Sequence, residues 1–220
     1  ELFIDLVDSA LLDVAVNSTG SIAAIATGST GILIVNLANP LNPMIATLDT
    51  PVVAFAVALS SDGTLAYIAD GGGGLKVASL ATPSVPSIIG SLAVTGIQRD
   101  VVVANNVAYL ADQMGRVVAV GIATPNAPQQ LDALLIGRYT FNVAVNENTL
   151  VVHSADSAAY LDVIDASIPT DLRLLSDGTS MAVDAAGGIK GLAISNGRAL
   201  VATGSQGLKL YDASATPVWR

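Results

Sequence analysis

The chain has 220 residues, of which 52% are hydrophobic and only 12% are charged. Its apolar residues come in short runs, and residues 52–59 form one of the longest. A membrane-spanning helix needs roughly 20 consecutive apolar residues. Every run here is interrupted by Gly, Asn, Asp or Pro, so we expect no membrane span and assign the apolar residues to buried strands.

Charge and cysteine content restrict the possible partners and chemistry. The formal net charge is −9, from nine Lys and Arg against eighteen Asp and Glu. An acidic surface repels phosphate backbones, so we expect no nucleic-acid partner. The absence of cysteine excludes disulfides, cysteine-ligated zinc and thiol catalysis, and it fits either redox compartment. No signal peptide is visible after Glu1, so we interpret the chain as a mature or excised domain whose targeting segment, if any, lies outside it.

The same succession of elements is predicted five times along the chain. An apolar first strand is expected at residues 14–16, 55–58, 101–103, 143–145 and 192–194. After a polar turn, a second strand is expected at 22–26, 65–69, 107–111, 150–154 and 199–202. A Gly-rich turn, absent only from the fourth repeat, leads to a third strand, and a fourth strand such as 44–48 or 87–92 completes the repeat. Short β-branched runs separated by Gly, Asn and Asp are typical of strands and tight hairpins.

A proline motif sets the period of this repeat. Its final prolines are separated by 43, 42, 44 and 48 residues, at Pro40, Pro83, Pro125, Pro169 and Pro217. Proline suits the connection from third to fourth strand, where its missing N–H leaves no ladder bond unmade. Four strands in roughly 40–45 residues is the size of a propeller blade. We therefore predict an all-β, five-bladed β-propeller with four-stranded antiparallel blades. It is one domain over 1–220, with blades at about 11–51, 52–96, 97–137, 138–180, and 189–220 plus 1–9.

The last blade is expected to be closed by the N-terminal strand. The fifth repeat has no fourth strand after Pro217, and residues 2–9 resemble residues 44–50, which form the fourth strand of the first repeat. Pairing these ends would leave no exposed sheet edge. The alternative is that the chain is a slice of a larger propeller.

The proline motif and the strand before it resemble the LVIVD-repeat family of β-propellers. Residues 31–43 read Gly-Ile-Leu-Ile-Val-Asn-Leu-Ala-Asn-Pro-Leu-Asn-Pro, against the family's Gly-Leu-x-Val-Val-Asp-Val-Ser-Asn-Pro-x-x-Pro. The motif aspartate is kept only as Asp165 and Asp212. The resemblance implies a mostly bacterial and archaeal family without common catalytic residues. It also implies an exported, cell-surface or periplasmic location.

The lone histidine, His153, is expected to be a buried structural residue. It aligns with Ile25, Ile68 and Leu110, and a single His without Cys cannot build an ordinary zinc site. A catalytic triad would have to use His153, and the chain has no nucleophile-elbow motif. The acids nearest the inner strands, Asp13 and Asp100, occupy different registers, which disfavours a glycosidase pair. We assign no catalytic residue.

Three aspartates, Asp70, Asp112 and Asp156, are predicted to lie on turns between second and third strands. Calcium could use such carboxylates together with carbonyl oxygens. The alternative is that each side chain bonds to its own turn backbone. Because no Asp-x-Asp-x-Asp string is present, we favour turn chemistry and expect neither a metal nor a cofactor.

The strongest candidate for a binding site is a set of departures from the repeat. The connections from fourth to first strands carry Gln98, Arg99, Arg138, Tyr139 and Lys190, and residues 181–188 lengthen the last of them. With His153, these residues form our predicted ligand-binding set, for a protein or a small anionic or polar ligand. Alternatively, the cations only offset acids such as Asp100 and Asp184. The predicted function is a non-catalytic binding or scaffold module. A hydrolase or lyase, and a spacer in a larger surface protein, remain as alternatives.

Overall fold

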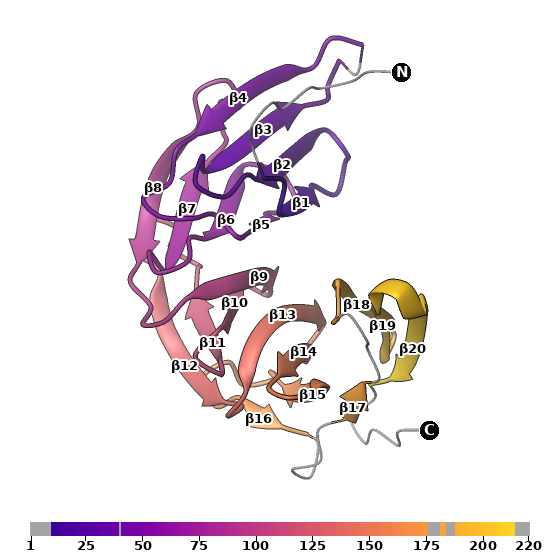
Figure 1. The fold of residues 1–220 in the computed structure, drawn as a ribbon. Coiled ribbons are helices and arrows are strands. Elements are labelled where there is room, and N and C mark those ends of the chain that lie inside the picture. The colour runs from indigo at the N-terminus through magenta and orange to yellow at the C-terminus, as the bar shows by residue number, and fades with distance from the viewer. Residues whose placement is uncertain (1–9, 40, 176–180, 184–187, 214–220) are drawn as a thin grey trace. The chain divides into compact units, whose positions relative to one another are not determined.

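The structure is a computed structural model that describes residues 10–39, 41–175, 181–183 and 188–213. The expected closing strand at residues 1–9 lies outside the described residues, as do Pro40, Asp184 and Pro217. Apart from one 3-10 turn, η1 (Gly204–Gln206), the described elements are all strands (Figure 1). The all-β prediction is therefore confirmed.

The strands form five antiparallel sheets in chain order (Figure 1). The first contains β1 (Asp13–Val16), β2 (Ile22–Ala26), β3 (Ile32–Asn36) and β4 (Met44–Leu48). The second contains β5 (Ala56–Leu59), β6 (Leu65–Ala69), β7 (Leu75–Ser79) and β8 (Ser87–Leu92). The third contains β9 (Gln98–Ala104), β10 (Val107–Asp112), β11 (Arg116–Gly121) and β12 (Gln129–Leu135).

The fourth and fifth sheets depart from the predicted four strands. The fourth contains β13 (Tyr139–Asn146), β14 (Thr149–Ala155), β15 (Ala159–Asp165), β16 (Arg173–Leu174) and β17 (Met181–Val183). Both β16 and β17 pair with β15, at opposite ends, so they act as two pieces of one outer strand. The sequence predicted that residues 181–183 belong to the connection before the fifth repeat. The pairing of β17 with β15 corrects this prediction. Within the described residues, the fifth sheet has only β18 (Gly191–Ser195), β19 (Arg198–Ala202) and β20 (Leu208–Asp212).

Turn residues explain why the hairpins end where they do. Asn105 and Asn106 have φ of 51° and 61°, and Asn196 and Gly197 have φ of 49° and 68°. Positive φ at both central residues is the requirement of the two-residue type I′ turn, which Asn and Gly adopt most readily. Both turns were predicted from these residues.

Glycine is required where the Gly-rich turns enter the third strands. Gly31 and Gly74 have φ of 82° and 78°, in the left-handed region. A Cβ at Gly31 would lie 2.2 Å from the carbonyl oxygen of Leu48, and one at Gly74 would lie 2.2 Å from that of Leu92. A side chain at either position would therefore collide with the backbone of the fourth strand, which explains why the repeat keeps glycine there.

The chain divides into two compact units. The first unit is Glu1–Val103 with Thr124–Pro128, and the second unit is Ala104–Ala123 with Gln129–Arg220. The first has a core that includes Ile32, Ile34 and Ile68, and the second has a core that includes Val151, Leu161 and Val201. Inner strands such as β10 are buried along their length, while β4 alternates between more and less exposed side chains. Continuous burial thus marks a central strand such as β10, and alternating burial marks a strand at the edge of a sheet such as β4.

Among the described residues, no helix has the length and apolar character that a membrane crossing requires.

Candidate functional site

One buried polar position recurs at the end of the second strand in all five sheets. The backbone N–H of Thr27, Asp70 and Thr203 donates to the carbonyl of the residue four positions later, which is Gly31, Gly74 and Gly207 respectively. Strand register places two further residues at this position, since Asp112 pairs with Arg116 and Ser154 pairs with Tyr160. We call this the hairpin-end position, and its members are Thr27, Asp70, Asp112, Ser154 and Thr203. All five are buried, with at most 6% of each residue exposed.

In the first and fifth sheets, the hydroxyl of the hairpin-end residue bonds to a backbone carbonyl of its own turn. The hydroxyl of Thr27 donates to the Gly31 carbonyl, and that of Thr203 donates to the Gly207 carbonyl, each at 2.9 Å. A hydroxyl can complete its hydrogen bonding within the turn in this way, because it needs no charged partner.

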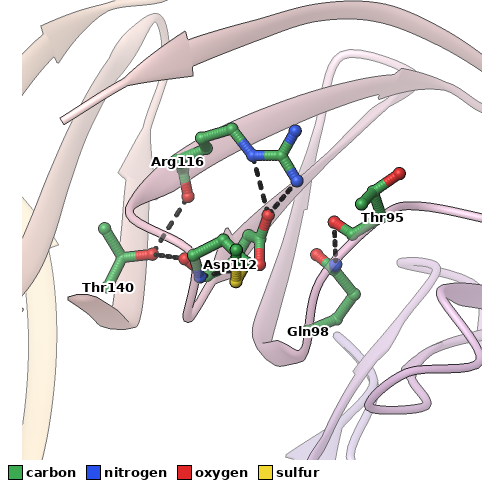
Figure 2. Close-up of polar contacts among 6 residues, drawn as sticks. Thr95, Gln98, Asp112, Arg116 and Thr140 are labelled. Atoms are coloured by element: carbon green, nitrogen blue, oxygen red, sulfur yellow. Dashed lines mark hydrogen bonds and ion pairs between the residues drawn. The ribbon is translucent and has the colours of Figure 1, made fainter. Parts of the chain in front are cut away.

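In the second and third sheets, the hairpin-end residue is an aspartate beside a cation. Lys76 Nζ lies 3.9 Å from Asp70 Oδ2, and Arg116 Nε donates to Asp112 Oδ2 at 2.9 Å. The Thr140 hydroxyl shares its hydrogen between the backbone carbonyls of Asp112, at 2.6 Å, and Arg116, at 3.0 Å (Figure 2). Asp112 is thus paired and hydrogen-bonded, as a stable buried carboxylate requires, whereas Asp70 Oδ2 has the charge of Lys76 nearby but accepts no hydrogen bond.

In the fourth sheet, the buried carboxylate lies on the third strand, β15, and not at the hairpin-end position. Asp162 on β15 is 1% exposed, and it accepts hydrogen bonds from Ser154 Oγ and, at 2.8 Å, from Arg138 Nη2. Arg138 Nε also donates to Ser154 Oγ at 3.1 Å, and the guanidinium lies 4.6 Å from the centre of the Tyr160 ring. Arg138, predicted as a ligand contact, is thus held by its own sheet.

The aspartates considered for calcium have protein partners. Asp70 Oδ1 accepts from Val52 N at 3.2 Å, and Asp112 Oδ1 accepts from Met114 N at 3.0 Å. Asp156 is exposed, and the backbone N–H of Ala158 is the main cause of its lowered pKa. No group of three or more His, Cys, Asp or Glu that could hold a metal ion occurs in the part of the chain that the structure describes. The contacts of Asp112 and Asp156 are the turn chemistry that the sequence favoured, whereas Asp70 bonds to Val52, outside its own turn.

His153 is a buried, uncharged side chain. It is 6% exposed, its Nδ1 lies 3.1 Å from Asn142 Oδ1, and its ring centre lies 5.4 Å from that of Phe141. Burial lowers the pKa of His153 to about 4, because desolvation penalises the charged imidazolium.

The sequence alignment of His153 is corrected by the strand register. His153 pairs with Leu161. In the other sheets the equivalent residue of the third strand pairs with an alanine: Ala26, Ala69, Ala111 or Ala202. His153 therefore replaces alanine rather than Ile25, Ile68 or Leu110. The alignment was shifted because the hairpin between β14 and β15 is longer than the others. A bulge at Phe141 in the adjacent β13 also places that ring against the imidazole.

Gln98 and Arg99 start β9 in the first unit. Gln98 is fully buried and bridges to Gly71, and its Nε2 donates weakly to the Thr95 carbonyl at 3.5 Å (Figure 2). Its Oε1 has no hydrogen-bond partner. Arg99 is half-buried, with its guanidinium carbon 4.2 Å from the centre of the Phe55 ring. With Gln98 and His153 both enclosed by protein, a ligand reaches neither side chain in this arrangement.

Tyr139 and Lys190 are the exposed members of the predicted set. Tyr139 is 57% exposed at the first residue of β13, and Lys190 is exposed just before β18. Lys190 N donates to the Ala202 carbonyl, as Phe55 N does to that of Ala69, so Lys190 occupies the repeat position of Phe55. In the fourth sheet the equivalent of Phe55 and Lys190 is Thr140, which pairs with Ser154. Arg138 lies two residues before it. Arg138 therefore does not share the repeat position of Lys190. Arg99 lies in the first unit, and Arg138 and Lys190 lie in the second.

Several important residues were missed by the sequence reasoning, namely Asp162, Ser154, Thr140 and Phe55. Asp162 had a usable signal, because the equivalent positions of the first and third sheets hold the apolar residues Leu33 and Val118. A charged residue inside an apolar strand predicts a buried partner.

The repeat and the fold both have relatives. A model described as the LVIVD repeat matches residues 55–94, 95–131 and 137–177, together more than half of the chain. No curated protein matches it. Among solved structures, hydrazine synthase of Kuenenia stuttgartiensis is similar with a TM-score of 0.73 and 13% identity over 91% of this chain and 57% of that one.

Two further similar structures are complexes. A mitotic checkpoint complex gives a TM-score of 0.72 and 12% identity, over 94% of this chain and 63% of that one. A nidogen/laminin complex gives 0.67 and 10%, over 94% of this chain and 78% of that one. The chain spans less than two thirds of the first two matched chains. At such identities the likeness shows the fold, a β-propeller, and nothing of activity.

Proposed function

We propose that this chain, which belongs to the LVIVD-repeat family of β-propellers, is a non-catalytic binding or scaffold module of an exported or cell-surface protein. The observation that carries the proposal is how the hairpin-end position is used. Its polar side chains are buried, and those of Thr27, Asp112 and Thr203 are bonded within their own hairpins. Groups held in this way stiffen a scaffold. A general acid or base needs access to the proton that it transfers.

Exposed departures from the repeat are where we place the contacts to a partner. Tyr139 combines a large apolar ring with a polar tip, and Lys190 adds a flexible cation. Tyrosine is enriched in protein interfaces for this reason. The similar chains from the mitotic checkpoint and nidogen/laminin complexes come from assemblies, which fits a binding role. The partner is a protein or a small anionic or polar ligand.

The exported location rests on the family resemblance. A hydrolase or lyase is the competing function, and a structural spacer in a larger surface protein is the third. Among the described residues, we find no side-chain arrangement that favours the hydrolase or lyase, and His153 is buried.

The test is a screen of the intact chain for both binding and turnover. The probes are a panel of short peptides and small carboxylates, followed by NMR, and chromogenic glycosides and esters, followed by absorbance. We expect saturable binding with the probes recovered unchanged. A Tyr139→Ala/Lys190→Ala double variant should weaken binding of a probe that contacts these two residues at least tenfold. The control, Arg173→Ala, removes an exposed cation on β16 and should not weaken it. Product formation that scales with protein concentration would favour the enzyme, and no binding to any probe would favour the spacer.

We also propose that the propeller has five blades and that residues 2–8 complete the fifth sheet. Two observations support this closure. The fifth sheet has three strands in the described part of the chain, and Leu208 and Leu210 on its outer strand β20 are 64% and 58% exposed. In the first sheet, the equivalent Ile32 and Ile34 pair with Leu48 and Ala46 of the fourth strand. Aligning residues 2–8 with 44–50 places Ile4 opposite Leu210.

A cysteine cross-link checks this closure, and the chain has no cysteine to interfere. An Ile4→Cys/Leu210→Cys variant should form a disulfide under mild oxidation, because residues directly opposite on neighbouring strands have Cβ atoms about 4.5–5.5 Å apart. Successive side chains of a strand point to opposite faces. The control, Asp5→Cys/Leu210→Cys, should therefore cross-link at least tenfold more slowly. Equal rates for the two variants would contradict the proposed pairing.

A further inference from the structure

Arg99 is oriented by an aromatic ring. Its guanidinium carbon lies 4.2 Å from the centre of the Phe55 ring, and the residue is half-buried. A guanidinium held against a ring keeps the N–H donors on its edge directed away from that ring. This packing therefore restricts the guanidinium more than full exposure to solvent would.

Four basic residues of the described chain each hold a carboxylate, and Arg99 is not one of them. Lys76, Arg116, Arg138 and Arg173 each lie within salt-bridge distance of an aspartate. No such pair includes Arg99 among the residues that the structure describes. The neighbouring Asp100 directs Oδ1 to the backbone N–H of Val101, at 2.8 Å. Within the described part of the chain, Arg99 is therefore a half-buried guanidinium without a carboxylate, in a protein of net charge −9.

Apolar residues occur on the two connections that lead to Phe55 and Arg99. The Phe55 ring lies against the turn at Gly71, where a Cβ would be 3.2 Å from the ring. Val52 and Ile97, on the two connections that lead into β5 and β9, are 43% and 41% exposed. Exposed aliphatic side chains on both of these connections favour a ligand that has an apolar part.

We infer that Arg99 binds a carboxylate carried by an apolar group. This assignment rests on the proposed binding function and adds Arg99, in the first unit, to the contacts proposed at Tyr139 and Lys190 in the second. A planar guanidinium matches a carboxylate with two parallel hydrogen bonds. A phosphate would also fit the guanidinium, but its second charge is repelled more strongly by the acidic chain. The carboxylate comes either from a chain terminus or acidic side chain of a peptide, or from a small organic acid.

Titration of the intact chain with benzoate tests the site, with benzamide and inorganic phosphate as comparison probes. We expect the Arg99 Nε–Hε NMR signal to shift saturably with benzoate, and benzamide and phosphate to bind at least tenfold more weakly. Arg99→Gln should lose benzoate binding. Arg198→Gln, which removes an exposed arginine that also has no carboxylate within salt-bridge distance among the described residues, should leave it unchanged.

Two further variants separate the binding role from a folding role. Arg99→Lys keeps the charge but lacks the planar fork, so it should fold and bind benzoate several-fold more weakly. Phe55→Leu should retain the arginine and also bind more weakly, because the ring no longer restricts the guanidinium. Peptides with a free carboxyl terminus, compared with amidated peptides that carry an acidic side chain, identify the preferred source. Benzoate shifts that persist in Arg99→Gln, or equal binding of phosphate, would overturn the inference, whereas turnover of a substrate would overturn only the proposed function.

Discussion

Replacing Asp162 with valine should lower the free energy of unfolding by about 2–3 kcal/mol. The side chain of Asp162 is 1% exposed and accepts hydrogen bonds from Arg138 and Ser154. Its removal takes an anionic partner from a guanidinium whose side chain is only 22% exposed. Because that side chain keeps some access to water, we expect a loss below the full cost of breaking a buried pair. A change of this size should lower the melting temperature by roughly 4–12 °C in a domain of this length.

Two controls show whether the pair itself is responsible. Asp162→Val/Arg138→Met should recover most of the loss, since replacing both members of a buried pair by apolar groups is often neutral. Valine is already present at the equivalent position of the third sheet, Val118, so its shape suits this strand. Asp171→Val breaks an exposed pair with Arg173 and should change stability by less than about 1 kcal/mol. A double variant as unstable as the single one would contradict the interpretation.

The strands of the first two sheets were predictable because their turns punctuate the sequence. The expected bounds of β2, β4, β6 and β8 match the structure residue for residue. Polar or Gly-containing turns such as 61–63, or the proline motif, stand at the ends of these strands, and these residues break the apolar pattern. The outer strand of the fourth sheet was not predicted, since its two pieces are separated in sequence and pair with β15 at different places. Pairing of this kind depends on register, which a single sequence does not display.

The candidate site was predictable as a set of departures from the repeat, but not as contacts. Tyr139 and Lys190 were identified by such departures and are exposed. Gln98 was identified in the same way and is buried, because whether a side chain points inward depends on a bridge to Gly71 that lies 27 residues away. The partner of Arg138, Asp162, is also distant in sequence, and neither residue is a typical motif position.

Stability should fall below pH 6.5 in a way that depends on His153. The pKa of His153 in the folded chain is about 4, against an ordinary value of 6.5, because burial disfavours the charged form. Its folded-state pKa is therefore lower than its unfolded-state pKa, and the unfolded chain binds the proton first as the pH falls. The contribution of the neutral, buried imidazole is complete above pH 6.5 and decreases between pH 6.5 and 4. Below pH 4 the loss levels off at about 3 kcal/mol, from 1.36 kcal/mol for each unit of pKa difference.

A His153→Ala variant isolates this effect, since alanine occupies the equivalent position in each of the other four sheets. The acidic pairs of the chain titrate in both proteins, so the difference in unfolding free energy between wild type and variant should report the histidine. We expect that difference to shift by about 3 kcal/mol against the wild type between pH 7 and pH 4, as measured by urea denaturation. Because His153 is the only histidine, its Cε1–H NMR signal should also titrate alone, with a midpoint near 4. Parallel stability curves, or a midpoint near 6.5, would show that the imidazole is reached by water and that its burial against Phe141 and Asn142 does not hold in solution.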